Sequence, residues 1–263
     1  MISFRLIGAP RVHIDGKPLP ISSRRQRVVL ASLLLRPGEV VPVGTLAEAV
    51  WPERQPKNPE NQIAICVHEL RRRFADRGVT GGLIVTEFGG YSVRVARESV
   101  DLFAIRARAA RADELERAGR PHEAVEQYRT ALAGWHGTLL QGLDVPALEP
   151  EVLWWQEKRL EVSERCLRLE LALGRHRDVL SELAALVAAH PVRESLRGML
   201  MTALYRSGRQ VEALQTYLAA QKTLRTTVGI DPSPALRSLY LDILNDTVPG
   251  PRADASRCLV RSC

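Results

Sequence analysis

The segment NQIAICVHELRRRF, residues 61–74, combines amide, imidazole, carboxylate and guanidinium side chains with regularly spaced apolar residues. At about 100° per residue of an α-helix, Ile63, Val67, Leu70 and Phe74 fall in one narrow sector, with Cys66 at its border. We expect this stripe to pack against the rest of a domain. The opposite face and its flanks carry mostly hydrogen-bonding residues: Asn58, Asn61, Gln62, Ile65, His68, Glu69, Arg71, Arg72 and Arg73.

This outward face has the chemistry needed to read base pairs in a DNA major groove. Asn and Gln amides can bond adenine bidentately, Glu can accept a hydrogen bond from cytosine, and an apolar side chain can contact a thymine methyl group. Arginines near the end of the helix would bind phosphates, and such binding weakens as salt concentration rises. The alternative is an ordinary solvated face, but the position of Ile65 in its middle favours DNA recognition.

Basic residues elsewhere in the first 100 positions extend the predicted interface. Arg24, Arg25 and Arg27 begin an earlier helical segment, where free backbone amides also favour phosphate. Arg94 and Arg97 lie on or just after a predicted hairpin, which would contact the DNA backbone or minor groove. Residues 1–100 carry a net charge of +6, and residues 101–263 carry a net charge of +1. This asymmetry indicates a first domain that faces nucleic acid and a second, nearly neutral domain.

Turn and periodicity signals predict the elements that position these residues. Short alternating pieces in residues 1–20 predict a small antiparallel sheet. Helical spacing predicts three helices. The first runs from Arg24 to a stop at Pro37–Gly38, the second covers residues 43–51, and the third runs from a cap at Asn58 to about residue 76. LIVTEF and YSVRV flank Gly89–Gly90 as a β-hairpin. This order predicts an α+β winged helix-turn-helix with an additional N-terminal sheet.

From residue 101 onward the strand signals end, and amphipathic helices with an internal repeat follow. The repeat occurs as GRPHEAVEQY (119–128), GRHRDVLSEL (174–183) and GRQVEALQTY (208–217). The step of 34 residues between the last two matches the period of a tetratricopeptide (TPR) unit. We therefore expect a winged-helix domain in residues 1–97, an all-α TPR-like repeat domain in residues 98–248 and a disordered tail in residues 249–263.

These segments also resemble a known family. RRQRVVLASLLLRPGEVVPVGTLAEAVW, NQIAICVHELRRRF and GGYSVRV resemble the OmpR-type winged-helix domain, and HPVRESLRGMLMTALYRSGRQVEAL resembles the bacterial transcriptional activator domain. The combination, over roughly residues 3–245, is similar to the Streptomyces antibiotic regulatory protein (SARP) family. The resemblance implies a transcriptional activator that controls a secondary-metabolite (antibiotic) gene cluster. It also implies binding to direct repeats near a promoter −35 element, as a homodimeric pair that contacts RNA polymerase holoenzyme.

The resemblance assigns a further role to the loop before the recognition helix. In winged helices of this type this loop contacts polymerase, and here its candidate residues are Pro52, Glu53, Arg54, Gln55 and Lys57. Trp51, just before the loop, is expected to anchor the core. His68-Glu69 stand where many relatives carry Ser-Arg, so we expect a changed base preference or a weaker attraction for phosphate. Without a G-x-x-x-x-G-K-[ST] motif, we expect no ATPase module of the kind that larger relatives carry. No receiver domain precedes the winged helix in this sequence, so we expect no direct switch by phosphorylation.

Other function classes have weaker support in the sequence. The six histidines are scattered and no G-x-S-x-G or H-E-x-x-H motif occurs, so we expect no enzyme activity, cofactor or metal. The four cysteines lack metal-ligand spacing and are expected to be reduced thiols. No apolar run approaches the roughly 20 residues of a membrane span, which favours the cytoplasm. Two alternative functions remain. One is a repressor or ligand-sensing regulator with the same winged helix, and the other is a TPR-like interaction scaffold.

Overall fold

The computed structural model describes residues 1–248, so the predicted tail, with Cys258 and Cys263, lies outside the described residues. Contacts divide the described chain into two compact units. The first unit contains residues 1–113 and 127–160, and the second contains residues 114–126 and the chain from residue 161 onward. This division does not coincide with a boundary between residues 97 and 98, which stays a prediction.

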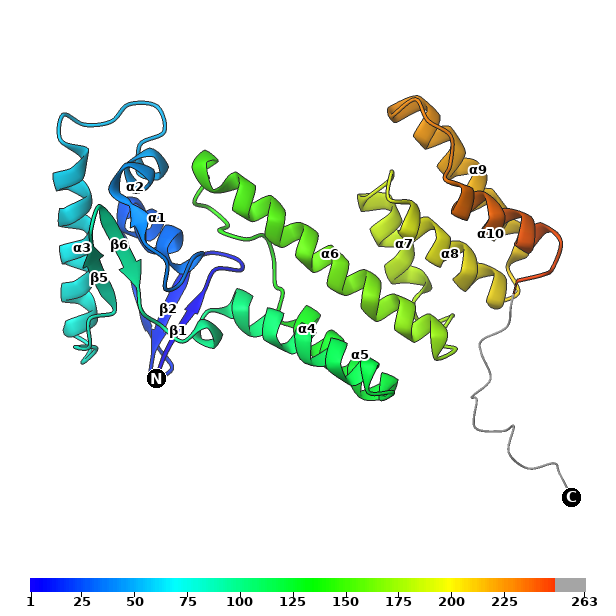
Figure 1. Ribbon diagram of the computed structural model, residues 1–263, viewed down its shortest axis with the longest axis horizontal. Helices are drawn as coiled ribbons and strands as arrows, with labels where there is room; N and C mark the ends of the chain where they lie inside the picture. Colours follow the sequence, from blue (N-terminus) through cyan, green and yellow to red (C-terminus); the bar gives the residue numbers. More distant parts are fainter. Residues whose placement is uncertain (249–263) are drawn as a thin grey trace, which may run out of the picture. The chain divides into compact units, whose positions relative to one another are not determined.

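A three-stranded antiparallel sheet forms at the N-terminus (Figure 1). Its strands β1 (Ile2–Arg5), β2 (Arg11–Ile14) and β3 (Lys17–Leu19) lie in sequence order. Phe4 pairs with Val12, and Val12 pairs with Leu19. All three side chains are buried, because directly opposed residues of neighbouring strands point to the same face. This face forms part of the core of the first unit.

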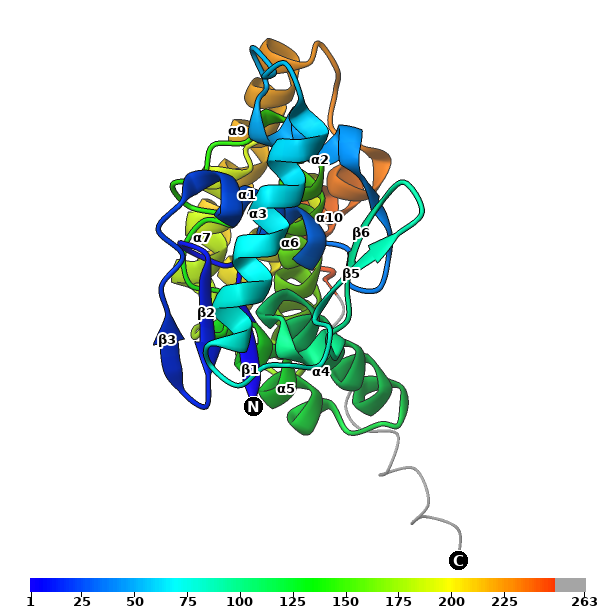
Figure 2. The ribbon, with the colours of Figure 1, turned by 90° about the vertical axis from the view of Figure 1, so that its left-hand side faces the viewer.

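Three helices follow at the predicted positions: α1 (Arg24–Leu34), α2 (Val43–Val50) and α3 (Pro59–Ala75). The start of α3 confirms the predicted cap, since the Asn58 side chain accepts a hydrogen bond from the Asn61 amide at 3.0 Å. Pro59 occupies the first helical position, where its missing N–H has no consequence. Helix α3 packs on α1 and α2 and lies along the outside of the first unit (Figure 2).

The predicted hairpin consists of β5 (Ile84–Glu87) and β6 (Gly90–Val93). Its turn contains Phe88 and Gly89, because Gly90 already belongs to β6. A short strand that the sequence analysis did not predict, β4 (Val41–Pro42), pairs with the other side of β6 and gives the order β4-β6-β5. A Cβ atom at Gly90 would lie 2.3 Å from the Val41 carbonyl oxygen, so only glycine allows this strand pair to approach.

The chain continues through η1 (Arg97–Ser99), α4 (Asp101–Arg117), α5 (Pro121–Ala133), η2 (Pro146–Leu148) and α6 (Glu149–Ala172). The Asp101 side chain ties the start of α4 to β1, since it accepts hydrogen bonds from the Leu6 and Ile7 amides at 3.0 Å. Phe103 packs edge-on against buried Trp155, with ring centroids 5.4 Å apart. Residues beyond 97 are therefore part of the core of the first unit.

The second unit is helical. It contains α7 (Leu180–Ala189), α8 (Glu194–Arg206), α9 (Gln210–Thr227) and α10 (Pro234–Leu244), besides the part of α6 from residue 161 onward. Its core is aliphatic and includes Leu167, Leu183, Met201, Ala213 and Ile243. A winged-helix region followed by a helical domain is the predicted fold class, which is confirmed. In the described part of the chain, no helix has the length and apolar character that a membrane crossing requires.

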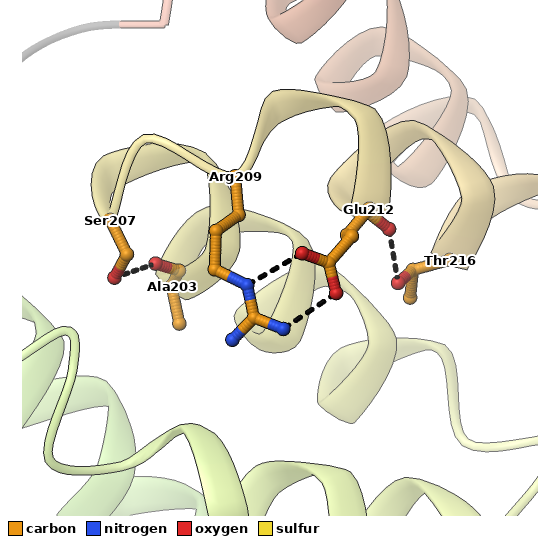
Figure 3. Close-up of polar contacts among 5 residues, drawn as sticks. All are labelled: Ala203, Ser207, Arg209, Glu212 and Thr216. Carbon is orange, nitrogen blue, oxygen red and sulfur yellow. Dashed lines mark hydrogen bonds and ion pairs between the residues drawn. The ribbon is translucent and has the colours of Figure 1, made fainter.

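The Gly-Arg repeats lie in turns that precede helices. Their glycines have positive φ angles of +71°, +82° and +81°, a conformation that glycine adopts without steric cost, at Gly119, Gly174 and Gly208. In the third repeat, Arg209 donates hydrogen bonds to both carboxylate oxygens of Glu212, at 2.7 and 2.5 Å (Figure 3). Arg120 pairs with Glu123 in the same way. In the first and third copies of the repeat, the arginine and the acidic residue thus act together at the start of the next helix.

Candidate nucleic-acid interface

Helix α3 separates a buried face from an exposed face, as its sequence pattern predicts. The apolar stripe packs into the core of the first unit and contains Ile63, Cys66, Val67, Leu70 and Phe74. Burial raises the pKa of the Cys66 thiol, and the negative charge of Glu69 acts in the same direction. Cys66 is therefore a neutral packing residue. Ile65, in contrast, keeps 43% of its surface exposed, so packing within this chain does not explain an apolar residue there.

The outer face of α3, defined here as Asn61, Gln62, Ile65, His68 and Arg72, carries the residues that were predicted to read bases. Asn61, His68 and Arg72 are exposed, and Gln62 is half-buried. Their spacing of three and four residues places them on one side of the helix. Asn58 is also exposed, but its side-chain oxygen is engaged in the helix cap. The outer face therefore presents amide, imidazole, guanidinium and apolar groups together.

Glu69 makes a contact that the sequence did not predict. Its carboxylate accepts a hydrogen bond from the side-chain amide of Gln26, a buried residue of α1. The contact joins α3 to α1 at the side of the outer face. It directs the carboxylate of Glu69 toward α1, and it provides a structural role for this acidic residue.

The three consecutive arginines of α3 have different environments. Arg71 donates hydrogen bonds to the Ile84 carbonyl and to the Thr86 hydroxyl, both at 2.9 Å, and so holds the hairpin against α3. Arg73 is half-buried and reaches the Pro20 carbonyl at 3.4 Å. Arg72 is exposed, and its guanidinium has no hydrogen bond or ion pair with another described residue. Arg72 is thus the guanidinium of this run best placed for an external anion.

The arginines at the start of α1 are also partly engaged. Arg24 donates hydrogen bonds to the Leu143 and Asp144 carbonyls, at 3.1 and 2.8 Å. The Arg25 guanidinium lies over the ring of Trp51, 5.4 Å from its centroid. Arg27 is half-buried, and its Nε atom is buried without a hydrogen-bond partner among the described residues. Of these three predicted phosphate contacts, exposed Arg25 remains the best placed.

Two exposed arginines follow the hairpin, and one exposed aromatic residue lies at its turn. Arg94 forms an ion pair with Glu87 at 3.2 Å, and the Arg97 guanidinium lies 5.8 Å from the centroid of the Phe103 ring. At the turn, Phe88 is fully exposed. Phe88 was not among the predicted site residues, although its position beside Gly89 at the predicted turn was a signal that it would project into solvent.

The loop between α2 and α3 is exposed at each of the candidate polymerase-contact residues: Pro52, Glu53, Arg54, Gln55 and Lys57. Trp51, at the start of this loop, is half-buried and packs against the core of the first unit, as expected of an anchor. Pro56, within the loop, is half-buried as well. The anchored start and the capped start of α3 fix both ends of an exposed loop.

Two family models match consecutive parts of the chain. The model of the C-terminal domain of transcriptional regulatory proteins matches residues 16–93. The bacterial transcriptional activator domain matches residues 100–244, which is more than half of the chain. The first match contains α1, α2, α3 and the hairpin, and the second contains α4 to α10.

Similar proteins are regulators from Streptomyces and Mycobacterium species. Regulatory protein AfsR of Streptomyces coelicolor is 38% identical over 92% of this chain, which spans only 24% of that relative's length. Regulatory protein DnrI of Streptomyces peucetius is 31% identical, and 92% of each chain is covered. The solved structure of Mycobacterium tuberculosis EmbR, in complex with a low-affinity phosphopeptide, has a TM-score of 0.90 at 32% identity, over 95% of this chain and 66% of EmbR.

These matches and the fold agree with the resemblance in the sequence. A winged helix with an N-terminal sheet precedes a helical activator domain in one chain, and the DnrI match extends over nearly the full length of both proteins. The chain belongs to the Streptomyces antibiotic regulatory protein family of transcriptional regulators.

Proposed function

We propose that this chain activates transcription by placing the outer face of α3 in the major groove of promoter DNA. The observation that carries the proposal is the exposure of Ile65 among the polar residues of a helix whose opposite stripe is buried. A major groove accepts one α-helix, and its base edges bond amides while thymine offers a methyl group to apolar side chains. Asn61, Gln62 and His68 would supply the hydrogen bonds, and Ile65 the apolar contact.

Phosphate contacts would come from the exposed arginines around this face. Arg72 and Arg25 flank the base-reading residues, and Arg94 and Arg97 extend the basic surface to the hairpin. Arg71, Arg73 and Arg24, also candidates for DNA contact, would mainly hold the hairpin, α3 and α1 in place through the contacts described above. Arg27, a further candidate, is half-buried and therefore less accessible to phosphate. Phosphate contacts fix the register of a protein on DNA, and base contacts provide its sequence preference.

Glu69 would act on sequence preference indirectly. Its carboxylate accepts a hydrogen bond from Gln26 of α1. Its negative charge therefore lies beside the outer face and does not point directly toward the DNA. We propose that this charge lowers affinity for phosphate and changes base preference relative to family members with an arginine there. Asn58 and Asn61 would act at the start of α3, where the helix enters the groove.

The family supports a regulatory setting for this DNA binding. We propose that the protein binds direct repeats near a −35 element as a homodimer, and that it controls a secondary-metabolite gene cluster. The exposed loop between α2 and α3 would contact RNA polymerase holoenzyme. Support comes from the activator-domain match and from the similarity to DnrI along the whole chain.

A gel-shift series with DNA from upstream of its own and neighbouring genes tests the DNA-binding part. We expect a sequence-selective shift that weakens with salt, because counterions are released from the phosphates. Gln62→Ala and Ile65→Ala should change the preferred sequence, at a cost of about 1–3 kcal/mol for one lost bidentate base contact. Arg168→Ala, an exposed arginine of α6 in the second unit, is the matched control.

Normal binding and selectivity in both α3 variants would show that another surface reads DNA. A parent protein that gives no selective shift with any of these DNAs would instead favour the interaction scaffold. Transcription in vitro with purified polymerase then determines the sign of regulation. We expect activation, and we expect Arg54→Ala with Lys57→Ala in the loop to reduce activation while DNA binding persists. Repression of the same promoter would overturn the activator assignment.

A further inference from the structure

The first unit contains an open cavity of about 680 Å³ beside the N-terminal sheet. Its wall is formed by the β1–β2 turn, the first half of α4 and the segment that follows α5. Three arginines line it, Arg5 and Arg11 from the sheet and Arg108 from α4, and Ile7 and Ile105 provide apolar surface. The volume lies within the range of about 300–1,000 Å³ that is typical of small-molecule sites.

The arginines bring positive charge to this cavity that no nearby group neutralises in full. Arg5 and Arg11 are directly opposed on β1 and β2, an arrangement that is unfavourable for like charges. Within residues 1–248, none of the three guanidinium groups forms an ion pair with a carboxylate. An anion held between these arginines would remove their mutual repulsion.

The carboxylate that lines the cavity is already used by the backbone. Asp101 accepts hydrogen bonds from the Leu6, Ile7 and Leu102 amides, at 3.0, 3.0 and 2.9 Å. Burial raises the pKa of Asp101, although these amides and the charge of Arg5 act in the opposite direction. The carboxylate therefore serves to fix the wall, and it leaves Arg11 and Arg108 without an acidic partner there.

Backbone hydrogen bonds hold the remaining wall in place. The Gly8 amide donates to the Thr138 carbonyl at 2.9 Å, and the Gln141 amide donates to the Gly8 carbonyl at 2.9 Å. The Leu140 amide donates to the Leu6 carbonyl at 2.8 Å. Because residues 6–8 are hydrogen-bonded on both sides, contacts within the chain hold this wall of the cavity in place. A preformed site costs less free energy to occupy than one that must be ordered on binding.

We propose that this cavity binds a small organic anion, with phosphate or carboxylate groups held by Arg5, Arg11 and Arg108 and an apolar body on Ile7 and Ile105. Arginine suits this role because its planar guanidinium bonds carboxylate and phosphate bidentately. The cavity is separate from the proposed DNA interface, since no residue of α3 or of the hairpin lines it. The site thus gives this regulator a place for a small-molecule effector.

Isothermal titration calorimetry with the full chain tests the site. The probes are 1-naphthyl phosphate, which joins a dianion to an apolar body, pyrophosphate, which has the charge alone, and 1-naphthol, which has the apolar body alone. We expect saturable one-to-one binding of 1-naphthyl phosphate, weaker binding of pyrophosphate and none of 1-naphthol. Arg5→Gln and Arg108→Gln should each weaken the phosphate probe at least about tenfold, because each removes a charge-assisted hydrogen bond.

The matched control is Arg117→Gln, an exposed arginine further along α4 that does not line the cavity. This variant should bind the probe as the parent does, and circular dichroism should show that all three variants are folded. Absence of saturable binding at about millimolar probe would overturn the proposal. Equal binding by parent and cavity variants would overturn it too. A loss of DNA affinity in the cavity variants with unchanged probe binding would instead assign these arginines to DNA.

Discussion

The outer face of α3 and the cavity beside β1 are both basic surfaces of the first unit, yet their shapes and chemistry differ. The outer face of α3 is the convex side of one helix, with a single unpaired arginine among amide, imidazole and apolar groups. The cavity is concave, and its three arginines come from segments about 100 residues apart in sequence, Arg5 and Arg11 on the sheet and Arg108 on α4.

This difference shows why net positive charge alone does not identify a ligand. A convex helix can enter a duplex groove, where different hydrogen-bonding groups meet different base edges. A cavity of this size instead surrounds a small molecule, and clustered guanidinium groups favour its acidic groups. Four predictions test whether each surface depends on the contacts that we assign to it.

The largest effect is expected at the buried side of α3. Leu70→Ala removes a fully buried side chain and should lower the free energy of unfolding by about 2–5 kcal/mol, since it creates a cavity in the core. Ile65→Ala, on the exposed side, should change it by less than about 0.5 kcal/mol. Urea unfolding followed by circular dichroism measures both. Similar losses in the two variants would mean that the faces are not separated as described.

The next effect concerns the wall of the cavity. Asp101→Ala leaves the Leu6 and Ile7 amides without their acceptor and should lower the free energy of unfolding by about 2–3 kcal/mol. Hydrogen exchange should increase at these two amides before it increases in α3. Unchanged exchange at both positions would show that this carboxylate does not hold β1 to α4.

A smaller effect is expected from the arginines of α3. Arg72→Ala should reduce the salt dependence of DNA binding by about one phosphate contact, a change of about 0.9 in the slope of log K against log salt. Arg73→Ala, a matched neighbour whose side chain is half-buried, should change that slope less. Gel shifts at several salt concentrations give both slopes. A larger change in slope for Arg73→Ala than for Arg72→Ala would show that Arg73, and not Arg72, makes the phosphate contact.

The smallest effect is a pH dependence at Asp101. Burial raises the pKa of this carboxyl in the folded state above its ordinary value of 3.8. The folded state therefore binds the proton more tightly than the unfolded state does. The stability that this proton adds is greatest below pH 3.8 and is lost as the pH rises through the pKa of the folded state. Asp101→Asn does not titrate there. The stability of the parent relative to this variant should therefore decrease as the pH rises above 3.8 and through the raised pKa of the folded state. Urea unfolding at several pH values measures this trend, and a constant or increasing difference would contradict it.

The sequence predicted the elements of the first unit because their signals are local. Apolar spacing identified the buried stripe of α3, and Asn58 with Pro59 identified its start. The strand β4 escaped prediction because two residues are too few to show an alternating pattern. The internal repeat predicted turns at the Gly-Arg pairs, whereas the hydrogen bonds between Arg209 and Glu212 became clear only in the structure.

The candidate DNA site was predicted as a set of residue types, and its internal contacts were not predictable. Glu69 meets Gln26 and Arg71 meets Ile84 because separate elements pack together, and no spacing along the chain encodes those pairs. The cavity escaped prediction for the same reason, since Arg108 approaches the N-terminal sheet only in the folded chain. Sequence patterns thus identified which helix matters, while packing separated free arginines from engaged ones.

The attachment of β1 has a practical consequence for dissecting this protein. Phe4 bridges to Val100, and Ile7 bridges to Leu139, so the outer edge of the N-terminal sheet is completed by chain that follows the winged helix. A fragment that stops at residue 97 would leave that strand edge bare, and bare edges recruit other strands and promote aggregation. Since both stabilising partners follow the winged helix, a fragment that is to keep this edge covered must extend beyond Leu139.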